Sequence, residues 1–327
     1  MKFSDKYIDL HAHLDGSITV DIAKKIAKIQ NIPLPNDDVL LNMLSLPPSC
    51  ESLNDFLKCF EFPLTLLQTK ESLTLAVELL LEKMKNDGVI YAEIRFAPQL
   101  HTKKGLTQEE AVIAAIEGLK NSSIPSNLIL CCMRGKGNET ENNLTIELAH
   151  KYLTDENGVA AVDLAGAEAL FPTENFAPLF KKASKYNIPI TIHAGEADGF
   201  KSVEAALKMG AKRIGHGIRI ADNEPIMEKI KDMGIFLEMC PTSNRQTKAV
   251  ADMKNYPIIK FLNKGIKITI NTDDLAIERT DIAKEFEYIE DKFNVTAEQE
   301  KIILKNSIDA AFTSERTKEN LRKQIGL

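Results

Sequence analysis

Short apolar runs alternate with amphipathic helical stretches from one end of this chain to the other. Most of the runs are apolar on both faces, as buried parallel strands covered by helices should be. Eight strands alternating with helices predict a (β/α)₈ TIM barrel with a helical insertion after the first strand, formed by residues 1–327 as one domain. A doubly wound open sheet is the rival, but no Gly-rich phosphate-binding turn follows the first run. The predicted strands are Tyr7–His13, Val89–Phe96, Leu128–Met133, Ala160–Ala165, Ile188–His193, Arg213–His216, Ile235–Met239 and Ile266–Asn271.

Helices are predicted between these strands. Glu71–Asn86 is the clearest, with Leu, Ala and Val at three-to-four spacing and Gly88 just past its end. Ile32–Leu66, which contains five prolines, is the one long irregular insertion, and we expect helices and loops over the barrel mouth there. In the C-terminal tail, Asp281 and Thr296 are expected to cap helices. The other predicted helices are Gln108–Leu119, Leu144–Leu153, Ala177–Tyr186, Ser202–Met209, Asn223–Met233 and Asn255–Asn263.

Composition and charge argue against several classes of protein. A net charge of −6, a pI near 5.7 and the absence of Trp give no sign of a nucleic-acid surface. No apolar run reaches the ~18 residues of a membrane span. No apolar leader precedes the first strand, so we expect a cytoplasmic protein. The five cysteines form no CxxC pair, which is typical of reduced, mostly buried thiols. The sequence makes no prediction of the oligomeric state.

Four of the six histidines lie at the ends of predicted strands, and so does an Asp-Asp pair. The C-terminal strand ends form the active site of a barrel, so these side chains are expected to meet. His11 and His13 are two residues apart, which places both imidazoles on one face of the first strand. Taken singly, each residue could equally be a buried structural histidine or a helix cap, so the prediction depends on their joint placement. The strand-end residues are His11, His13, His193, His216, Asp273 and Asp274.

Histidines and one Asp are a common ligand set for a catalytic zinc that keeps a position open for water. The HExxH motif and the H-x-E plus P-C-x-x-C signature are absent, and the fourth strand lacks a Lys that would bridge two metals. We therefore predict one Zn²⁺ per chain, with His216 left for proton transfer. His101, in a loop beside two lysines, and His150, in an amphipathic helix, are predicted to be surface residues. The predicted metal ligands are His11, His13, His193 and Asp273.

A set of short motifs runs through most of the chain. The motifs are His11-Ala-His13-Leu-Asp15-Gly16, Ser52-Leu53-x-x-Phe56-Leu57-x-x-Phe60, Tyr91-Ala-Glu-Ile-Arg95-Phe-Ala-Pro98, Leu130-Cys-Cys-Met-Arg134, Asp163-Leu-Ala-Gly166, His193-Ala-Gly-Glu196, Gly215-His216-Gly217, Cys240-Pro-Thr-Ser243-Asn244 and Thr272-Asp273-Asp274. Through these motifs, which taken together are highly specific, the sequence resembles the adenosine deaminase family. One departure is Ala167, where many relatives carry an acidic residue before Glu168.

The resemblance implies hydrolysis of the purine 6-amino group of adenosine and 2′-deoxyadenosine, giving inosine or deoxyinosine and ammonia in purine salvage. Zinc would lower the pKa of its water from roughly 15.7 to about 7. Attack at C6 puts negative charge on N1, where Glu196 would donate a proton. His216 would take or hold the proton of the attacking water. Asp273 would bind zinc and accept a hydrogen bond from the same water.

The resemblance also implies the substrate contacts. Asp274 would face N7, the Gly166 backbone N–H would face N3, and His13 would lie beside the substrate as well as the metal. Asp15 would meet a ribose hydroxyl, although its spacing alone favours a turn residue before Gly16. If the strand continued, Asp15 would share the face of the HxH pair, because it follows that pair by two residues.

An apolar stripe in the insertion is predicted to lie over the pocket. Leu53, Phe56, Leu57 and Phe60 have the i, i+3, i+4, i+7 spacing of an amphipathic helix. The pattern alone favours packing onto the barrel rim. The resemblance favours a lid that excludes water from the purine, and one helix can serve both purposes.

Three alternatives remain open. An adenine deaminase would share the metal set but act on the free base, and a Glu at position 15 would have favoured it. A secreted growth-factor-type relative would need a signal peptide and an extra N-terminal domain, and neither is seen in the sequence. A non-enzymatic metal-binding or purine-binding module is disfavoured because Glu196 and His216 add proton-transfer groups that binding does not require.

Overall fold

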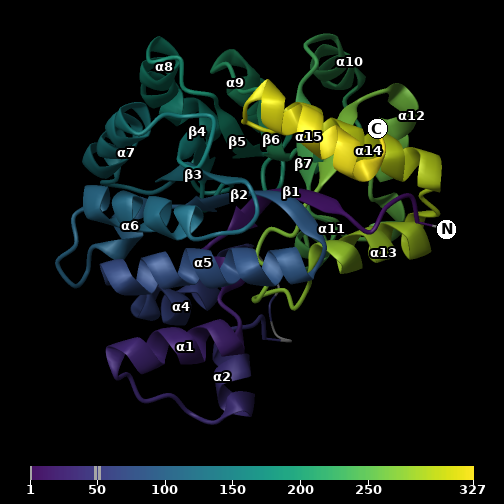
Figure 1. Ribbon diagram of the computed structural model, residues 1–327. Coiled ribbons are helices and arrows are strands. Elements are labelled where there is room, and N and C mark those ends of the chain that lie inside the picture. Colours follow the sequence, from purple (N-terminus) through teal and green to yellow (C-terminus); the bar gives the residue numbers. More distant parts are fainter. Residues whose placement is uncertain (1, 48–49, 51–52) are drawn as a thin grey trace.

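Eight parallel strands form the centre of the protein in residues 2–47, 50 and 53–327, which the computed structural model describes (Figure 1). They form two four-stranded sheets, β1-β2-β3-β4 and β5-β6-β7-β8. Parallel bridges between Val162 and Ile190 and between Ala12 and Asp273 join the two sheets at both edges. The predicted (β/α)₈ barrel is confirmed. The strands are β1 (Tyr7–His13), β2 (Val89–Phe96), β3 (Ser126–Met133), β4 (Val159–Ala165), β5 (Thr191–Ala194), β6 (Arg213–His216), β7 (Phe236–Met239) and β8 (Lys267–Ile270).

The bounds of β1, β2 and β6 are those that the sequence predicts. The clearest difference is β5, which begins at Thr191, whereas the apolar run begins at Ile188. Pro189 interrupts the ladder because it has no N–H to donate, although its carbonyl accepts a hydrogen bond from Val162. The shift does not move His193, which stays in the strand.

The helices surround the strands and carry the caps that begin them. Asp281 accepts a hydrogen bond from the Lys284 N–H, and Thr296 accepts one from the Gln299 N–H, as predicted. The helices of the barrel and tail are α5 (Lys70–Asn86), α6 (Gln108–Lys120), α7 (Glu139–Lys151), α8 (Ala177–Lys185), α9 (Phe200–Lys208), α10 (Glu224–Asp232), α11 (Pro241–Gln246), α12 (Ile258–Lys264), α13 (Ile282–Phe293), α14 (Ala297–Ala310) and α15 (Glu315–Ile325).

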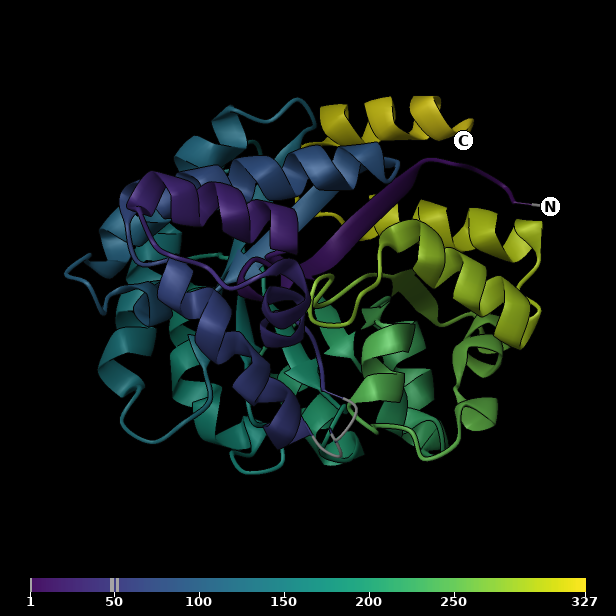
Figure 2. The ribbon, with the colours of Figure 1, turned by 90° about the horizontal axis from the view of Figure 1, so that it is seen from below.

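The predicted insertion after β1 is helical and lies across one end of the barrel, as the purple and dark blue segments of Figure 2 show. The predicted range Ile32–Leu66 contains α2 (Asp37–Met43), α3 (Leu53–Phe56), a 3₁₀ helix η2 (Leu57–Phe60) and α4 (Glu61–Leu66), and α1 (Val20–Gln30) precedes it. The apolar stripe is therefore not one α-helix, since its second half winds more tightly. Pro48 of the insertion and Ser52 of the stripe motif lie outside the described residues.

Helix α1 was not predicted. Its sequence does carry helix signals, because Thr19 caps its first turn and Asn31 ends it in the left-handed conformation. Among the described residues, no helix combines the length and the apolar character needed to cross a membrane. Four of the five cysteines are buried and Cys59 is half-buried, in agreement with the prediction of mostly buried thiols.

Candidate active site

A cavity of about 260 Å³ opens at the C-terminal ends of the strands, beneath the insertion helices. Every predicted site residue except His11 lines this cavity. His11 is fully buried directly behind it. The fold thus brings together side chains from β1, β4, β5, β6, β8 and the insertion that are far apart in the sequence, as barrel topology predicts.

Two of these residues have an unusual backbone. His216 and Asp273 both have positive φ, of 62° and 64°, a region that non-glycine residues seldom occupy. Such strain persists only where the surrounding structure holds it, and it concentrates at functional sites. Gly16 allows the close approach of Asp274, because a Cβ at position 16 would lie 1.7 Å from the Asp274 Oδ1 atom.

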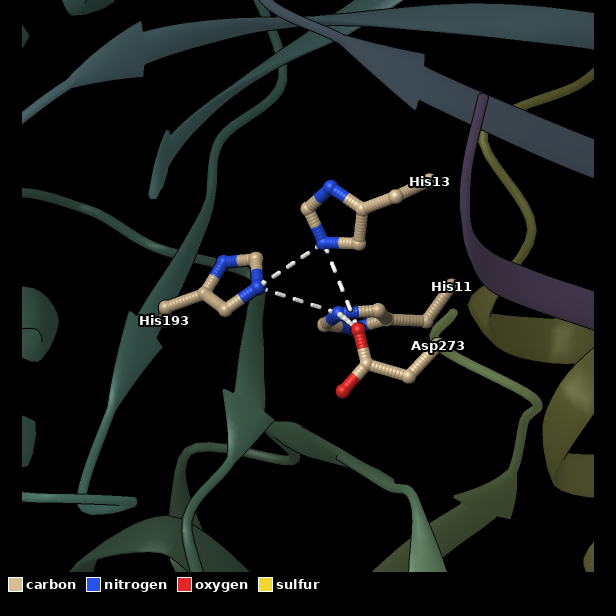
Figure 3. A group of neighbouring side chains, drawn as sticks. All are labelled: His11, His13, His193 and Asp273. Atoms are coloured by element: carbon tan, nitrogen blue, oxygen red, sulfur yellow. Dashed lines mark hydrogen bonds and ion pairs between the residues drawn. The ribbon is translucent and has the colours of Figure 1, made fainter. Parts of the chain in front are cut away.

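Four donor atoms converge on one point at the bottom of the cavity (Figure 3). The Nε2 atom of His193 lies 3.1 Å from that of His11 and 3.2 Å from that of His13. The Oδ1 atom of Asp273 lies 3.3 Å from His11 Nε2 and 3.4 Å from His13 Nε2. Metal–nitrogen bonds of about 2.0–2.1 Å would put tetrahedral ligand atoms about 3.3–3.4 Å apart, so the donor set fits an ion such as Zn²⁺.

The charge states of this group also suit a cation. Burial lowers the pKa of His13 well below its usual value, which leaves a neutral ring with a free lone pair. Burial alone would raise the pKa of Asp273, but the imidazoles of His11, His216 and His13 outweigh it and hold that pKa well below its usual value. The site therefore presents a neutral His13 ring and one carboxylate, which are forms that bind metals.

Two buried carboxylates orient the imidazoles from behind. His11 Nδ1 donates to Glu238 Oε2 at 2.7 Å, and His193 Nδ1 lies 2.8 Å from Asp163 Oδ2. A proton held on each Nδ1 leaves Nε2 free to face the centre, and metal-binding histidines usually have such a carboxylate on their other ring nitrogen. Glu238 and Asp163 are both fully buried.

An arginine joins these two carboxylates inside the barrel. Arg95 donates to Asp163 at 2.9 Å and to Glu238 at 2.8 Å. Burial would raise the pKa of Glu238, but Arg95 and Arg213 overcome it and keep that pKa well below its usual value. No role was predicted for Asp163, Glu238 or Arg95 from the sequence. The sequence did contain a signal for these residues, since each is a charged residue within an otherwise apolar strand run. Burying such a charge costs free energy unless an opposite charge pairs with it.

His216, the last residue of β6, lines the cavity beside the four converging donors. Its Nε2 atom lies 3.6 Å from Glu196 Oε2 and 3.7 Å from Asp273 Oδ2. Asn244 in α11 donates from Nδ2 to His216 Nδ1 at 3.0 Å, while its Oδ1 accepts from the Tyr256 hydroxyl at 3.1 Å. In this arrangement the neutral His216 ring carries its proton on Nε2, facing the cavity. Asn244 was quoted in the sequence motif but was given no role.

Two further carboxyl groups line the cavity near the insertion. Burial raises the pKa of Asp15 to about 6. Burial and the neighbouring Asp273 carboxylate raise the pKa of Asp274 well above its usual value. The expected period-two placement of Asp15 is wrong, because β1 ends at His13 and Asp15 begins a 3₁₀ helix, η1 (Asp15–Ser17). This turn nevertheless brings Asp15 to the cavity wall.

The apolar stripe forms the roof of the cavity. Phe56 is buried and the other three members are half-buried. The edge of one ring of the Phe56–Phe60 pair faces the other, with an interplanar angle of 63° and centroids 6.0 Å apart. Phe56 also packs on Ile277 beyond β8, which ties the insertion to the opposite rim. The stripe residues that line the cavity are Leu53, Phe56, Leu57 and Phe60.

The surface prediction for His101 is wrong, whereas His150 is exposed as predicted. His101 is fully buried, and its Nδ1 lies 2.8 Å from the Leu67 carbonyl oxygen. Burial lowers its pKa to about 4, so the ring is neutral. The two lysines that suggested a surface loop follow a 3₁₀ helix, η3 (Pro98–His101), which turns the imidazole inward against Phe96.

Comparison with known proteins agrees with this geometry. The family described as Adenosine deaminase matches residues 7–326. A protein named Adenosine deaminase from Haemophilus ducreyi is 46% identical over 97% of this chain and 95% of its own length.

Two solved structures share the fold at lower identity. An adenine deaminase from Arthrobacter aurescens superposes with a TM-score of 0.89 at 24% identity, covering 99% of this chain and 98% of its own. An amidohydrolase from Burkhoderia ambifaria with bound Zn superposes with a TM-score of 0.86 at 22% identity, covering 98% and 89%. At these identities the likeness shows the fold alone.

Proposed function

Because the chain belongs to the adenosine deaminase family, we propose that it hydrolyses the 6-amino group of adenosine and 2′-deoxyadenosine. The products are inosine or deoxyinosine and ammonia, which places the reaction in purine salvage. One observation carries the proposal: a carboxyl group, Glu196, and an imidazole, His216, face a four-donor metal group inside a cavity of about 260 Å³. A module that only bound a metal or a purine would not require this pair. We also propose that residues 1–327 form one domain, since a single apolar core contains both Tyr7 and Ile325.

We propose that one Zn²⁺ per chain is held by His11, His13, His193 and Asp273. The donor chemistry and spacing support this, and so does the bound Zn of the structurally similar amidohydrolase. When bound, the ion supplies a nucleophile at neutral pH by lowering the pKa of water from roughly 15.7 to about 7. Glu238 and Asp163 would keep the imidazoles in the binding tautomer, as their contacts with Nδ1 indicate.

The proton transfers are assigned to three side chains. Attack of water on C6 moves electron density to N1, where Glu196 donates a proton. Asp273 is ionised, so it accepts a hydrogen bond from the attacking water. His216 carries its own proton on Nε2, so in the neutral state it donates to that oxygen and holds it in place. With its own proton on Nε2, the neutral His216 ring does not take the proton of the attacking water through that atom, and it instead orients the water oxygen.

The remaining polar groups would recognise the nucleoside. Asp274 keeps its proton because its pKa is raised well above its usual value, so it can donate to N7, which only accepts. The Gly166 N–H would face N3, and its backbone φ of 101° is open to glycine in particular. His13 would contact the substrate from the metal side. Leu53, Phe56, Leu57 and Phe60 would cover the purine and exclude water.

Adenosine turnover by the purified protein tests the proposal directly. We expect the ultraviolet spectrum of adenosine to change to that of inosine, with one ammonia released per nucleoside. Removal of the metal by a chelator should abolish the change, and one equivalent of Zn²⁺ should restore it. A metal-loaded protein that bound adenosine without releasing ammonia would contradict the proposed activity and favour a binding module.

The preference for nucleoside over free base is expected to depend on Asp15. A ribose hydroxyl would donate to this buried carboxyl group, and losing a hydrogen bond to a charged group costs on the order of 1.5–3 kcal/mol. The wild-type protein should therefore prefer adenosine to adenine by at least about tenfold in kcat/KM, since roughly 1.4 kcal/mol is a factor of ten. In Asp15→Ala this preference should shrink because kcat/KM falls for adenosine and not for adenine. The metal content should be unchanged. Equal turnover of adenine and adenosine by the wild type would instead support the adenine-deaminase alternative.

A further inference from the structure

Glu168 has no part in the reaction described so far, yet it is among the most heavily hydrogen-bonded side chains of the molecule. It follows β4 in the loop beside Gly166, and it is 1% exposed. Its carboxylate reaches the loop after β5 and accepts hydrogen bonds from four consecutive backbone N–H groups. The Oε1 atom accepts from Gly195 at 2.6 Å, and the Oε2 atom accepts from Glu196 at 3.0 Å, Ala197 at 2.7 Å and Asp198 at 3.1 Å.

These four N–H groups converge because the loop turns sharply at Gly195, whose φ is 75°. Successive N–H groups in such a turn form a concave site for an anion. Here a side chain of the protein itself fills the site. The Ser202 hydroxyl at the start of α9 completes the shell with a bond of 2.5 Å to Oε1. The loop therefore depends on one carboxylate for the pairing of its buried donors.

The same loop carries Glu196, which also accepts hydrogen bonds from two residues outside the loop. The Glu196 carbonyl accepts from Arg219 Nε at 2.5 Å, and its Oε1 atom accepts from the Thr247 hydroxyl at 3.2 Å. Glu168 supplies the contact to the Glu196 N–H. Backbone and side chain are thus restrained together, with the Glu196 carboxyl 3.6 Å from His216 Nε2.

Arg134, the residue directly after β3, supports this arrangement. It is 5% exposed, and its guanidinium donates to the His193 carbonyl at 2.6 Å and to Thr173 Oγ1 at 2.9 Å. Thr173 in turn contacts the Ser202 hydroxyl at 2.6 Å, so cation and carboxylate share one network. Glu168 is the single acidic residue between Gly166 and Phe171, because Ala167 contributes no charge.

We propose that Glu168 is a positioning residue for Glu196. Its carboxylate holds the loop after β5 so that the Glu196 carboxyl group lies where the purine N1 must receive a proton. The proposal rests on the proposed function. Glu196 is needed for proton transfer and not for binding the ground state, so its misplacement affects kcat more than KM.

The test variant is Glu168→Gln, which keeps the shape but turns an NH₂ group toward backbone donors. We expect kcat for adenosine to fall by about 10–100-fold, since a displacement on the order of 1 Å has effects of this size. KM should change by less than about threefold, and the metal content should stay the same.

Glu300→Gln is the matched control. Glu300 is equally buried and accepts a backbone hydrogen bond from Phe3 at 2.6 Å, but it lies in α14, away from the cavity, so kcat should stay within about twofold of the wild type.

A double-mutant cycle separates positioning from general structural damage. In a Glu196→Gln background, adding Glu168→Gln should lower kcat by less than about threefold, because the group to be positioned is already gone. The same fold-loss in both backgrounds would overturn the proposal. If Glu168→Gln fails to fold, Glu168→Asp takes its place in the cycle, since it keeps the negative charge with a shorter reach. A wild type without deaminase activity would contradict the proposed function, whereas an active wild type with a fully active Glu168→Gln variant would contradict only this inference.

Discussion

Replacement of Glu196 by glutamine is expected to lower kcat for adenosine by about 10²–10⁴-fold, the usual contribution of general acid–base catalysis. The substitution preserves the shape of the side chain and its hydrogen bond from Thr247, but an amide cannot deliver a proton to N1. The metal content should be unchanged, because Glu196 is not among the four converging donors. Steady-state kinetics together with metal analysis of the same preparation provide the measurement.

Glu204→Gln is a suitable control for this variant. Glu204 lies in α9, shortly after the Glu196 loop, and its partly exposed side chain pairs with Lys208 at the surface. Its replacement should leave kcat near the wild-type value. His216→Ala should lose rate and keep its metal, since His216 is assigned to the attacking water. Turnover by Glu196→Gln at the wild-type rate would show that another group protonates N1.

Loss of any one of the four metal donors is expected to remove both the metal and the activity. The relevant variants are His11→Ala, His13→Ala, His193→Ala and Asp273→Ala. Changes to outer-shell partners typically cost about 10–100-fold in metal affinity, so removal of a direct ligand should cost more. Metal content of the purified variants and the rate of adenosine deamination measure the two losses.

His150→Ala provides the control for these variants, because His150 is an exposed histidine in α7, stacked on Tyr186 with ring centroids 4.1 Å apart. It should keep its metal and its rate. Two metal ions per active chain, or full activity in a metal-free protein, would contradict the single-zinc proposal. A variant that lost activity while keeping its metal would remove that residue from the ligand set.

Local periodicity was enough to predict the strands and most helices. The apolar run Tyr7–His13 is a strand in the structure with the same bounds, and period two does put His11 and His13 on one side, where they meet a common centre. Helix α7 shows the limit. It was predicted from Leu144 but begins at Glu139, because its polar first turns carry no apolar period. Where a segment's own pattern is strong, the sequence predicts the element.

The environment of a side chain was harder to predict, as His101 shows. Its neighbours in sequence are two lysines, which indicated a surface loop, but a turn of 3₁₀ helix buries the ring against Phe96. Asp15 is the converse case. Strand β1 ends before Asp15, so the strand periodicity that predicted its place at the pocket does not apply. The 3₁₀ turn η1 nevertheless places Asp15 on the cavity wall. Both outcomes depend on packing between segments that no local pattern describes.

The sequence by itself determined the barrel, the strand ends that carry histidines, and the donor types that suit a metal. Tertiary structure alone decided which groups support them: Glu238 behind His11 is 227 positions away, and Glu168 reaches the Glu196 loop from the end of another strand. These residues become neighbours only when the barrel closes and brings strands that are distant in the sequence side by side. The strength of a buried charge's interactions depends on which partners lie within hydrogen-bonding distance, and only the folded chain brings those partners together.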